Sequence, residues 1–297
     1  MNAKWITPAV TVLDSNGHVD GEENCRVYEN LIQKGMDGIL LLGSIGEFFA
    51  IPMEEKRELV KTAVKAVRGR VPLIVGTNCM VVDECVAFSN YALEQGADGV
   101  IVISPYYVNL PDSSLEAFYD RIAREVKGKI YLYNYPGVTG YELHPELILK
   151  LAMKHENIVG IKDTVPNMDH TRAIITLVKE QRPDFQVFSG FDENFAHNLL
   201  CGGSGCMAGT SNFAPEFSAA FADAARRDDL AGMAACQKKI DSLMAIYSIR
   251  SLFVPIIKEA MVLRGIISSA VCAQPHCHAT AEETEAVRQL LEKNGLK

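Results

Sequence analysis

The sequence predicts an α/β fold, a (β/α)8 TIM barrel followed by a helical C-terminal extension. Three observations predict it. Short apolar runs rich in β-branched residues recur along the chain, amphipathic helical patterns lie between them, and the last part of the chain has helical periodicity alone. The runs expected to form strands are residues 6–12, 38–42, 72–77, 99–103, 130–133, 158–162, 185–189 and 203–209.

The segments between these runs have the pattern of surface helices. In residues 52–67, Leu59, Ala63, Val64 and Val67 recur at helical spacing, and the charged run 54–57 is expected to face outward. Residues 83–95 follow the same pattern. Strands that alternate with helices form parallel sheets, and eight such units are the number that closes a barrel.

The chain after the eighth run has no strand pattern. Its helical segments are residues 219–226, 230–247, 253–264 and 281–293. No low-complexity tract or linker interrupts the chain. We therefore expect residues 1–225 to form the catalytic barrel and residues 226–297 to form a helical extension packed on it.

Composition excludes several classes of function. The chain has 297 residues and a net charge of −8, without the basic face that nucleic-acid binding requires. It contains no apolar stretch of about 20 residues that could cross a membrane, and its first residues do not read as a secretory signal. Its eight cysteines are scattered without a Cys-x-x-Cys pair. Reduced thiols in a cytoplasmic protein are the simplest interpretation.

One short segment gathers four potential soft metal ligands, Cys272, His276, Cys277 and His278. Zinc sites usually draw paired ligands from two separate segments, and only one is evident here. A connecting loop between helices is the simpler interpretation, and a metal site is the alternative.

Lys162 ends the sixth run, where a barrel strand would direct its side chain toward the active-site face. Partial desolvation favours the neutral form of an amine, and a neutral amine can attack a ketone to form a Schiff base. A lysine can also simply mark the point where a strand meets water. The residues at the other strand ends must decide between the two.

Polar side chains and glycines follow the other predicted strands. The second strand leads into the loop 43–47, whose backbone N–H groups, near a helix start, could hold a carboxylate. The others are Tyr107 after the fourth strand, Tyr133 at the end of the fifth, and Gly190, Asp192 and Glu193 after the seventh.

Each of these residues has a structural explanation when taken alone. A tyrosine at a strand end is often a packed aromatic, a glycine-rich turn is often only a turn, and adjacent acids often cap a helix. Together they supply an amine nucleophile, hydroxyl groups that carry protons, a carboxylate cradle and two acids. This set suits carbon–carbon chemistry on a 2-keto acid and needs neither a metal nor a cofactor.

Several motifs stand at these strand ends in a characteristic order: Gly43-Ser44-x-Gly46-Glu47, Tyr106-Tyr107, Tyr133-Asn134-x-Pro136-x-x-Thr139-Gly140 and Gly160-Ile161-Lys162. They resemble the pyruvate-dependent class I aldolases, the superfamily that includes dihydrodipicolinate synthase and N-acetylneuraminate lyase. The resemblance covers nearly the whole chain and implies the same barrel fold.

The resemblance also implies roles for individual residues. Lys162 would form the Schiff base with pyruvate, and Tyr133 would carry the proton to and from the substrate. Ser44 would link Tyr133 to Tyr107, which would reach in from a neighbouring subunit of a homotetramer built from two dimers. Backbone N–H groups of Ser44 and Ile45 would bind the pyruvate carboxylate.

Two departures distinguish this chain from the synthases that condense aspartate semialdehyde. Val138 stands where those enzymes typically have an arginine that grips the carboxylate of the aldehyde, and Ile45 stands where they have a second threonine. The segments 162–164 and 190–193 instead resemble those that hold polyhydroxylated chains in sugar-acid aldolases. The resemblance implies Thr164, Gly190, Asp192 and Glu193 as residues that bind the substrate.

The runs 133–136, 160–164, 211–215 and 253–260 most resemble those of the 2-keto-3-deoxygluconate-type aldolases. We therefore expect cleavage or formation of a 2-keto-3-deoxy sugar acid, with pyruvate and an aldehyde as the small-molecule partners. N-acetylneuraminate lyase, dihydrodipicolinate synthase and a dehydratase or hydratase-aldolase remain alternatives within the superfamily. More distant alternatives are a non-catalytic sugar-acid-binding protein and a metal-dependent barrel hydrolase that uses the Cys272 to His278 segment.

Overall fold

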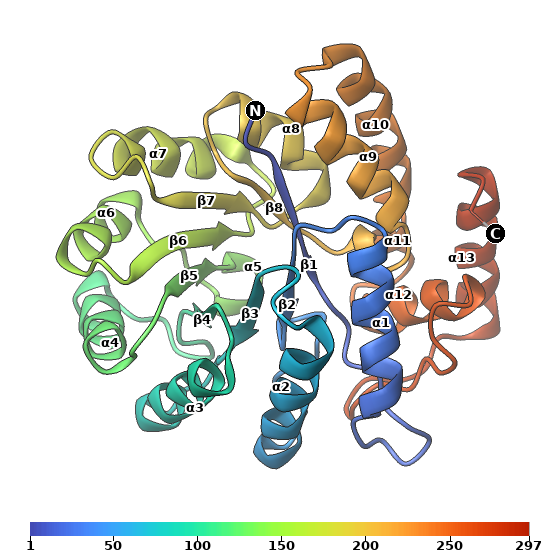
Figure 1. Cartoon of the computed structure of the whole chain (residues 1–297), viewed down its shortest axis with the longest axis horizontal. Helices are drawn as coiled ribbons and strands as arrows, with labels where there is room; N and C mark the ends of the chain where they lie inside the picture. Colours follow the sequence, from blue (N-terminus) through green and yellow to red (C-terminus); the bar gives the residue numbers. More distant parts are fainter. Residues whose placement is uncertain (297) are drawn as a thin grey trace. The chain divides into compact units, whose positions relative to one another are not determined.

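The computed structural model describes residues 1–296 (Figure 1). Within this range eight parallel strands form a closed barrel in sequence order, which confirms the predicted (β/α)8 fold. The strands are β1 (Lys4–Pro8), β2 (Gly38–Leu41), β3 (Leu73–Gly76), β4 (Gly99–Ile103), β5 (Ile130–Asn134), β6 (Ile158–Asp163), β7 (Gln186–Ser189) and β8 (Gly205–Met207).

Amphipathic helices connect the strands, and acceptor side chains begin several of them. The Asp20 carboxylate caps the first helix by accepting hydrogen bonds from the N–H groups of Glu22 and Glu23. The helices up to the end of the barrel are α1 (Gly21–Gln33), α2 (Met53–Val67), α3 (Val82–Gln95), α4 (Asp112–Glu125), α5 (Pro136–Thr139), α6 (Pro145–Lys154), α7 (Met168–Lys179), α8 (Phe195–Leu200) and α9 (Pro215–Arg226), with short 3-10 turns η1 (Asp192–Asn194) and η2 (Thr210–Asn212).

Four further helices follow, as the helical periodicity predicted: α10 (Leu230–Leu243), α11 (Ile246–Ile249), α12 (Val254–Leu263) and α13 (Ala281–Lys293). The expected helix 230–247 is divided between α10 and α11. A capping box formed by Thr280 and Glu283 fixes the start of α13. Within residues 1–296 no helix is long and apolar enough to span a membrane.

Two compact units make up the described chain. The first contains Trp5–Leu73 and the chain from Ala208 onward, and its core includes Trp5 packed 6.2 Å from Phe221 between ring centroids. The second contains Asn2–Lys4 and Ile74–Met207. The loop after β2 therefore belongs to the first unit, and the ends of β4 to β7 belong to the second.

The first predicted strand is shorter than expected. β1 ends at Pro8, although the apolar run continues to residue 12. The N–H of Ala9 still donates to the carbonyl of Leu40 at 2.9 Å, and side-chain amides then replace the strand ladder. Asn212 Oδ1 accepts from the N–H of Val10 at 3.1 Å, and Asn24 Oδ1 accepts from the N–H of Val12 at 3.1 Å. The segment was predicted to be a strand because it is apolar, and it is indeed buried. Buried N–H groups can, however, be satisfied by side chains as well as by a neighbouring strand.

A bulge between β5 and β6 sets the register on which the candidate site depends. Ile130 pairs with Ile158, but Tyr131 pairs with Gly160, so that Val159 is an extra residue in β6. As a result Tyr133 is the partner of Lys162. In an unbulged ladder Ile161 would face Tyr133, because a one-residue shift exchanges the two faces of a strand.

Candidate functional site

The centre of the candidate site is a contact between Lys162 and Tyr133 on neighbouring strands. Lys162 is the penultimate residue of β6, and its side chain is only 5% exposed. Its Nζ donates a hydrogen bond to Tyr133 Oη at 3.3 Å and lies 4.5 Å from the centre of the tyrosine ring. The structure thus brings the predicted nucleophile and the predicted proton carrier together in a buried environment.

The residues directly after this pair form a polar network that the sequence analysis did not identify. Asp163 is fully buried, and its carboxylate accepts from Asn134 Nδ2 at 2.7 Å and from Thr171 Oγ1 at 2.6 Å. His170 Nδ1 lies 3.0 Å from the same carboxylate. Asn134 follows Tyr133 and Asp163 follows Lys162, so this network ties together the strand ends that carry the pair.

His170 is placed to carry a positive charge. Its Nδ1 faces the Asp163 carboxylate and its Nε2 faces the carbonyl oxygen of Leu143 at 2.9 Å, so both ring nitrogens meet acceptors and both must donate. Burial opposes the charged ring, but the hydrogen bond and negative charge of Asp163 outweigh it and raise the pKa of His170. The only sequence signal was the order of the residues: His170 and Thr171 lie on the first turn of the helix that follows the Lys162 strand.

Replacing His170 by glutamine is expected to lower stability in a pH-dependent way. Because its pKa is higher in the folded than in the unfolded chain, protonated His170 contributes its full stability below about pH 6.5. This contribution is lost as the pH rises through the raised pKa of the folded state. Urea unfolding of both proteins between pH 6 and 9 should show a difference in free energy that shrinks as the pH rises.

The matched control is Thr171→Val, which removes another donor to the same carboxylate without removing a group that titrates in this range. Its cost in unfolding free energy should stay constant between pH 6 and 9. A pH-independent cost for His170→Gln would contradict the assignment of a charged His170.

Thr164 and Gly190, both predicted to bind substrate, lie against each other in the second unit. A Cβ atom added to Gly190 would come within 1.9 Å of Thr164 Oγ1, so only glycine fits there. The Thr164 side chain is 6% exposed, and its hydroxyl has no hydrogen-bond partner among the described residues. A buried hydroxyl without a partner is costly, and a polar ligand would satisfy it.

The two predicted acids lie at the start of the 3-10 turn η1. The Asp192 side chain is buried and the Glu193 side chain is half-buried. Ser189, at the end of β7, donates from its hydroxyl to the carbonyl of Phe191 at 3.3 Å and helps to hold this turn.

Tyr107 points away from the chain that carries it. Its side chain is 97% exposed, and its backbone adopts a left-handed conformation with φ of 76°. For a residue other than glycine this conformation costs about 1 kcal/mol. The preceding residue anchors the loop, since the N–H of Tyr106 donates to Met80 Sδ at 3.2 Å. Within one chain Tyr107 therefore does not join the buried Lys162–Tyr133 pair.

Ser44 and Ile45 lie in the first unit, in a series of turns between β2 and α2. The helix that follows this loop is α2, which begins at Met53. A carboxylate cradle made by the N–H groups of this loop stays a prediction. Gly46 allows the close turn, since a Cβ atom there would lie 3.0 Å from the backbone nitrogen of Leu42.

The strand-five loop that carries Val138 forms the single-turn helix α5. Pro136 lies in its first turn, and Gly140 ends it in a left-handed conformation with φ of 86°. Val138 on this turn is exposed, so a substrate group that approached it would meet an apolar side chain and no cation.

The four soft ligands near the C-terminus have different surroundings. Cys272 is buried, and burial raises the pKa of its thiol to about 12, which disfavours the thiolate that binds metals. His276 is buried against the Glu47 carboxylate, whereas Cys277 and His278 are exposed. Within residues 1–296 no three His, Cys, Asp or Glu side chains have the spacing of a metal site.

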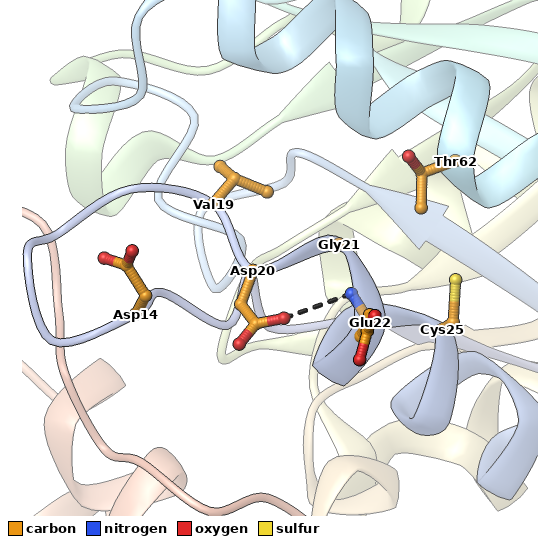
Figure 2. A pocket seen from close by; sticks show the side chains of 7 residues that line it. All are labelled: Asp14, Val19, Asp20, Gly21, Glu22, Cys25 and Thr62. Atoms are coloured by element: carbon orange, nitrogen blue, oxygen red, sulfur yellow. Dashed lines mark hydrogen bonds between the residues drawn. The ribbon is translucent and has the colours of Figure 1, made fainter.

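A separate surface groove of about 640 Å³ lies beside the start of α1 (Figure 2). It contains none of the predicted site residues. Its acidic residues are Asp14, Asp20 and Glu22, and Asp20 is the helix cap described above, which accepts from the Glu22 N–H at 3.1 Å. Helix capping thus accounts for the Asp20 carboxylate in this groove.

Comparison with known proteins places the chain in a family. The model of the dihydrodipicolinate synthetase family matches residues 1–294. The probable 2-dehydro-3-deoxy-D-pentonate aldolase YjhH of Escherichia coli K12 is 38% identical over 291 residues, which is 98% of this chain and 97% of the relative. The putative 2-dehydro-3-deoxy-D-gluconate aldolase YagE of the same organism is 36% identical over 260 residues, 88% of this chain and 86% of the relative.

The fold agrees with the sequence relationship. The crystal structure of YagE from E. coli K12, a prophage protein in complex with pyruvate, superimposes with a TM-score of 0.97 at 33% identity and covers 99% of both chains. These matches confirm the predicted superfamily, the barrel and the class of enzyme, a carbon–carbon lyase that works through a lysine Schiff base. The chain belongs to the dihydrodipicolinate synthetase family.

Proposed function

We propose that this protein is a class I aldolase that cleaves or forms a 2-keto-3-deoxy sugar acid, with pyruvate and an aldehyde as the other partners. The observation that carries the proposal is the contact of 3.3 Å between Lys162 Nζ and Tyr133 Oη in a buried environment. The names of YjhH and YagE, both aldolases of 2-dehydro-3-deoxy acids, support this substrate class. Val138 supports it as well, because it offers no cation for the carboxylate of aspartate semialdehyde.

Lys162 begins the reaction. Its neutral amine attacks the C2 carbonyl carbon of the keto acid to form a carbinolamine, and loss of water gives a protonated imine. Tyr133 Oη, within hydrogen-bond reach of the amine, serves the proton transfers that this addition and dehydration require.

Tyr133 then acts on the substrate hydroxyl. It removes the proton from the C4 hydroxyl while the C3–C4 bond breaks, and the electron pair of that bond moves into the imine to give an enamine. The aldehyde leaves, C3 of the enamine takes up a proton, and water releases pyruvate and the free amine. The cationic imine beside the phenol favours its deprotonated form, so charge and geometry act in the same direction.

Other groups would hold the two ends of the substrate. The N–H groups of Ser44 and Ile45 bind the carboxylate, and Ser44 passes protons between Tyr133 and Tyr107, as the resemblance implies. Beyond C4, the unsatisfied hydroxyl of Thr164 is available for a substrate hydroxyl, and Gly190 accommodates the Thr164 side chain in this position. Asp192 and Glu193 are the further acceptors in this proposal.

The proposed assembly is a homotetramer of two dimers, in which Tyr107 completes the site of its partner. Its support is the outward direction of a strained Tyr107 and a set of exposed apolar residues. Val108 is next to Tyr107 in sequence, and Met80, which Val81 follows, accepts the hydrogen bond from the N–H of Tyr106. We also propose a cytoplasmic location, for which the eight free thiols are the support.

Mixed dimers test the role of Tyr107 directly. We expect Lys162→Ala and Tyr107→Phe homomers each to be impaired, and coexpressed mixed dimers to regain one complete site. In the mixed dimer the subunit with Lys162 receives the intact Tyr107 of its partner. If the mixed dimer is no more active than the Tyr107→Phe homomer, Tyr107 acts in the site of its own chain or takes no part in the mechanism.

Borohydride reduction with pyruvate, followed by peptide mass mapping, tests the chemistry. We expect one pyruvyl adduct, on Lys162; no adduct, or an adduct on another lysine, would overturn the proposal. Assays with 2-keto-3-deoxygluconate, 2-keto-3-deoxypentonate, N-acetylneuraminate and aspartate semialdehyde then choose the substrate class. Faster turnover of either of the last two, or loss of water without release of pyruvate, would assign the chain to another branch of the superfamily.

A further inference from the structure

The Glu47 carboxylate, at the end of the loop after β2, is buried without access to water. Both Glu47 and Lys258 of α12 have 0% exposed side chains, and they form an ion pair. Lys258 Nζ also donates to the carbonyl of Val271 at 2.7 Å. Removal of two charges from water is expensive, and such a pair persists only where further hydrogen bonds satisfy both partners.

The second carboxylate oxygen of Glu47 receives such hydrogen bonds from the segment that contains Cys272, His276, Cys277 and His278. Glu47 Oε2 accepts from the N–H of Ala273 at 2.7 Å, and His276 Nδ1 lies 3.2 Å away. One carboxylate thus joins the loop after β2, helix α12 and residues 271–276. This arrangement gives the otherwise unexplained His276 a structural partner.

Apolar packing shields the carboxylate from solvent. Leu13, Ile51 and Ala273 form a buried cluster, and the ring of Phe49 packs edge-on against His276 with centroids 5.4 Å apart. Both side chains of the ion pair are fully buried, and salt screens a buried pair much less than an exposed one.

The backbone of Glu47 connects this anchor to the proposed carboxylate cradle. Glu47 has a left-handed φ of 55°, and its N–H donates to the carbonyl of Ser44 at 3.2 Å. That carbonyl belongs to the same planar trans peptide as the N–H of Ile45, and in such a peptide the C=O and N–H bonds point in opposite directions. A hydrogen bond that holds the carbonyl oxygen therefore also fixes the direction of the N–H. The N–H of Phe48 likewise lies 3.5 Å from the carbonyl of Gly43, whose peptide carries the N–H of Ser44.

We propose that the buried Glu47–Lys258 pair, with Ala273 and His276, positions the N–H groups of Ser44 and Ile45 that receive the pyruvate carboxylate. Glu47 is a positioning residue in this scheme and does not touch the substrate. The inference rests on the proposed function, because it presumes that pyruvate binds this loop. The anchor makes the C-terminal segment a determinant of affinity for the keto acid.

The test uses a neutral replacement of similar shape, the double variant Glu47→Gln/Lys258→Met. Removing only one charge would leave the other buried and unpaired, whereas replacing both is often nearly neutral for folding. The half-saturating concentrations of pyruvate and of methyl pyruvate are measured by borohydride trapping, with thermal unfolding as a check of the fold. Methyl pyruvate retains the ketone but lacks the negative charge that the cradle would bind.

We expect the half-saturating concentration of pyruvate to rise about tenfold in the double variant, while that of methyl pyruvate changes little. A purely structural role would shift the unfolding temperature and affect both probes alike or neither. Equal changes, or an unchanged value for pyruvate, would overturn the positioning role.

Two single variants complete the design. His276→Ala keeps the ion pair and removes one contact to Glu47, and it should raise the half-saturating concentration of pyruvate about twofold to threefold. If the double variant does not fold, His276→Ala tests the positioning role by itself. An unchanged half-saturating concentration in this variant would then overturn the inference. Cys277→Ser, in an exposed neighbour, is the matched control and should change neither value. A wild-type protein without any adduct would overturn both proposals, whereas an adduct with no effect in the variants would overturn only this one.

Discussion

The Lys162→Arg variant is expected to lose at least about 10⁴-fold in kcat, because arginine retains the positive charge but cannot form the imine. The side chain is buried beside Tyr133, and β5 and β6 contain no second lysine that could replace it. Steady-state release of pyruvate from the sugar acid measures the loss, and borohydride should trap no adduct.

An exposed lysine provides the control for this experiment. Lys65 on α2 is exposed, and Lys65→Arg should retain wild-type kcat and the adduct on Lys162. Residual turnover in Lys162→Arg within tenfold of the wild type would mean that the Schiff base is not on the reaction path, even if Lys162 can be labelled.

The Tyr133→Phe variant should lose about 10²–10⁴-fold in kcat, the usual contribution of a positioned acid or base. Phenylalanine keeps the ring beside Lys162 Nζ and removes only the oxygen, which is 3.3 Å from that nitrogen. Trapping of pyruvate on Lys162 should continue at a lower rate, because the amine remains and only proton transfer is impaired. Single-turnover trapping and steady-state cleavage, measured together, separate the two effects.

Tyr135 is the matched control, since its ring stacks on that of Tyr133 with centroids 6.1 Å apart. Burial raises the pKa of Tyr135 to about 12, so its hydroxyl is a poor base near neutral pH. We expect Tyr135→Phe to change kcat less than tenfold. A larger loss in Tyr135→Phe than in Tyr133→Phe would exchange the roles of the two tyrosines.

The barrel could be predicted from sequence because each strand is a separate signal. A buried parallel strand is apolar on both faces, so the run 99–103 gave the bounds of β4, and Lys162 was conspicuous as a charge at the end of such a run. The same logic failed after residue 9, because the buried N–H groups of Val10 and Val12 bond to the side-chain amides of Asn212 and Asn24 in place of a strand ladder.

Features that depend on contacts distant in sequence could not be predicted. The position of His170 after the Lys162 strand did not predict its charge, which depends on the Asp163 carboxylate and the Leu143 carbonyl meeting its two ring nitrogens. In the sequence, Glu47 is only the last residue of a glycine-rich loop. Its ion pair with Lys258 could not be predicted, because Lys258 is more than 200 residues away. Proximity between such residues follows from the fold and is not contained in any local pattern.

The extra residue in β6 has a consequence for judging related chains. Lys162 faces Tyr133 because Val159 shifts the pairing by one position. A relative could keep both residues at these positions and pair the two strands without a bulge. Both motifs would then be intact, but the amine would point to the opposite side of the sheet from the tyrosine. The presence of the lysine and the tyrosine is therefore insufficient evidence of activity. The register between the two strands, including any bulge before the lysine, must also place the two residues opposite each other.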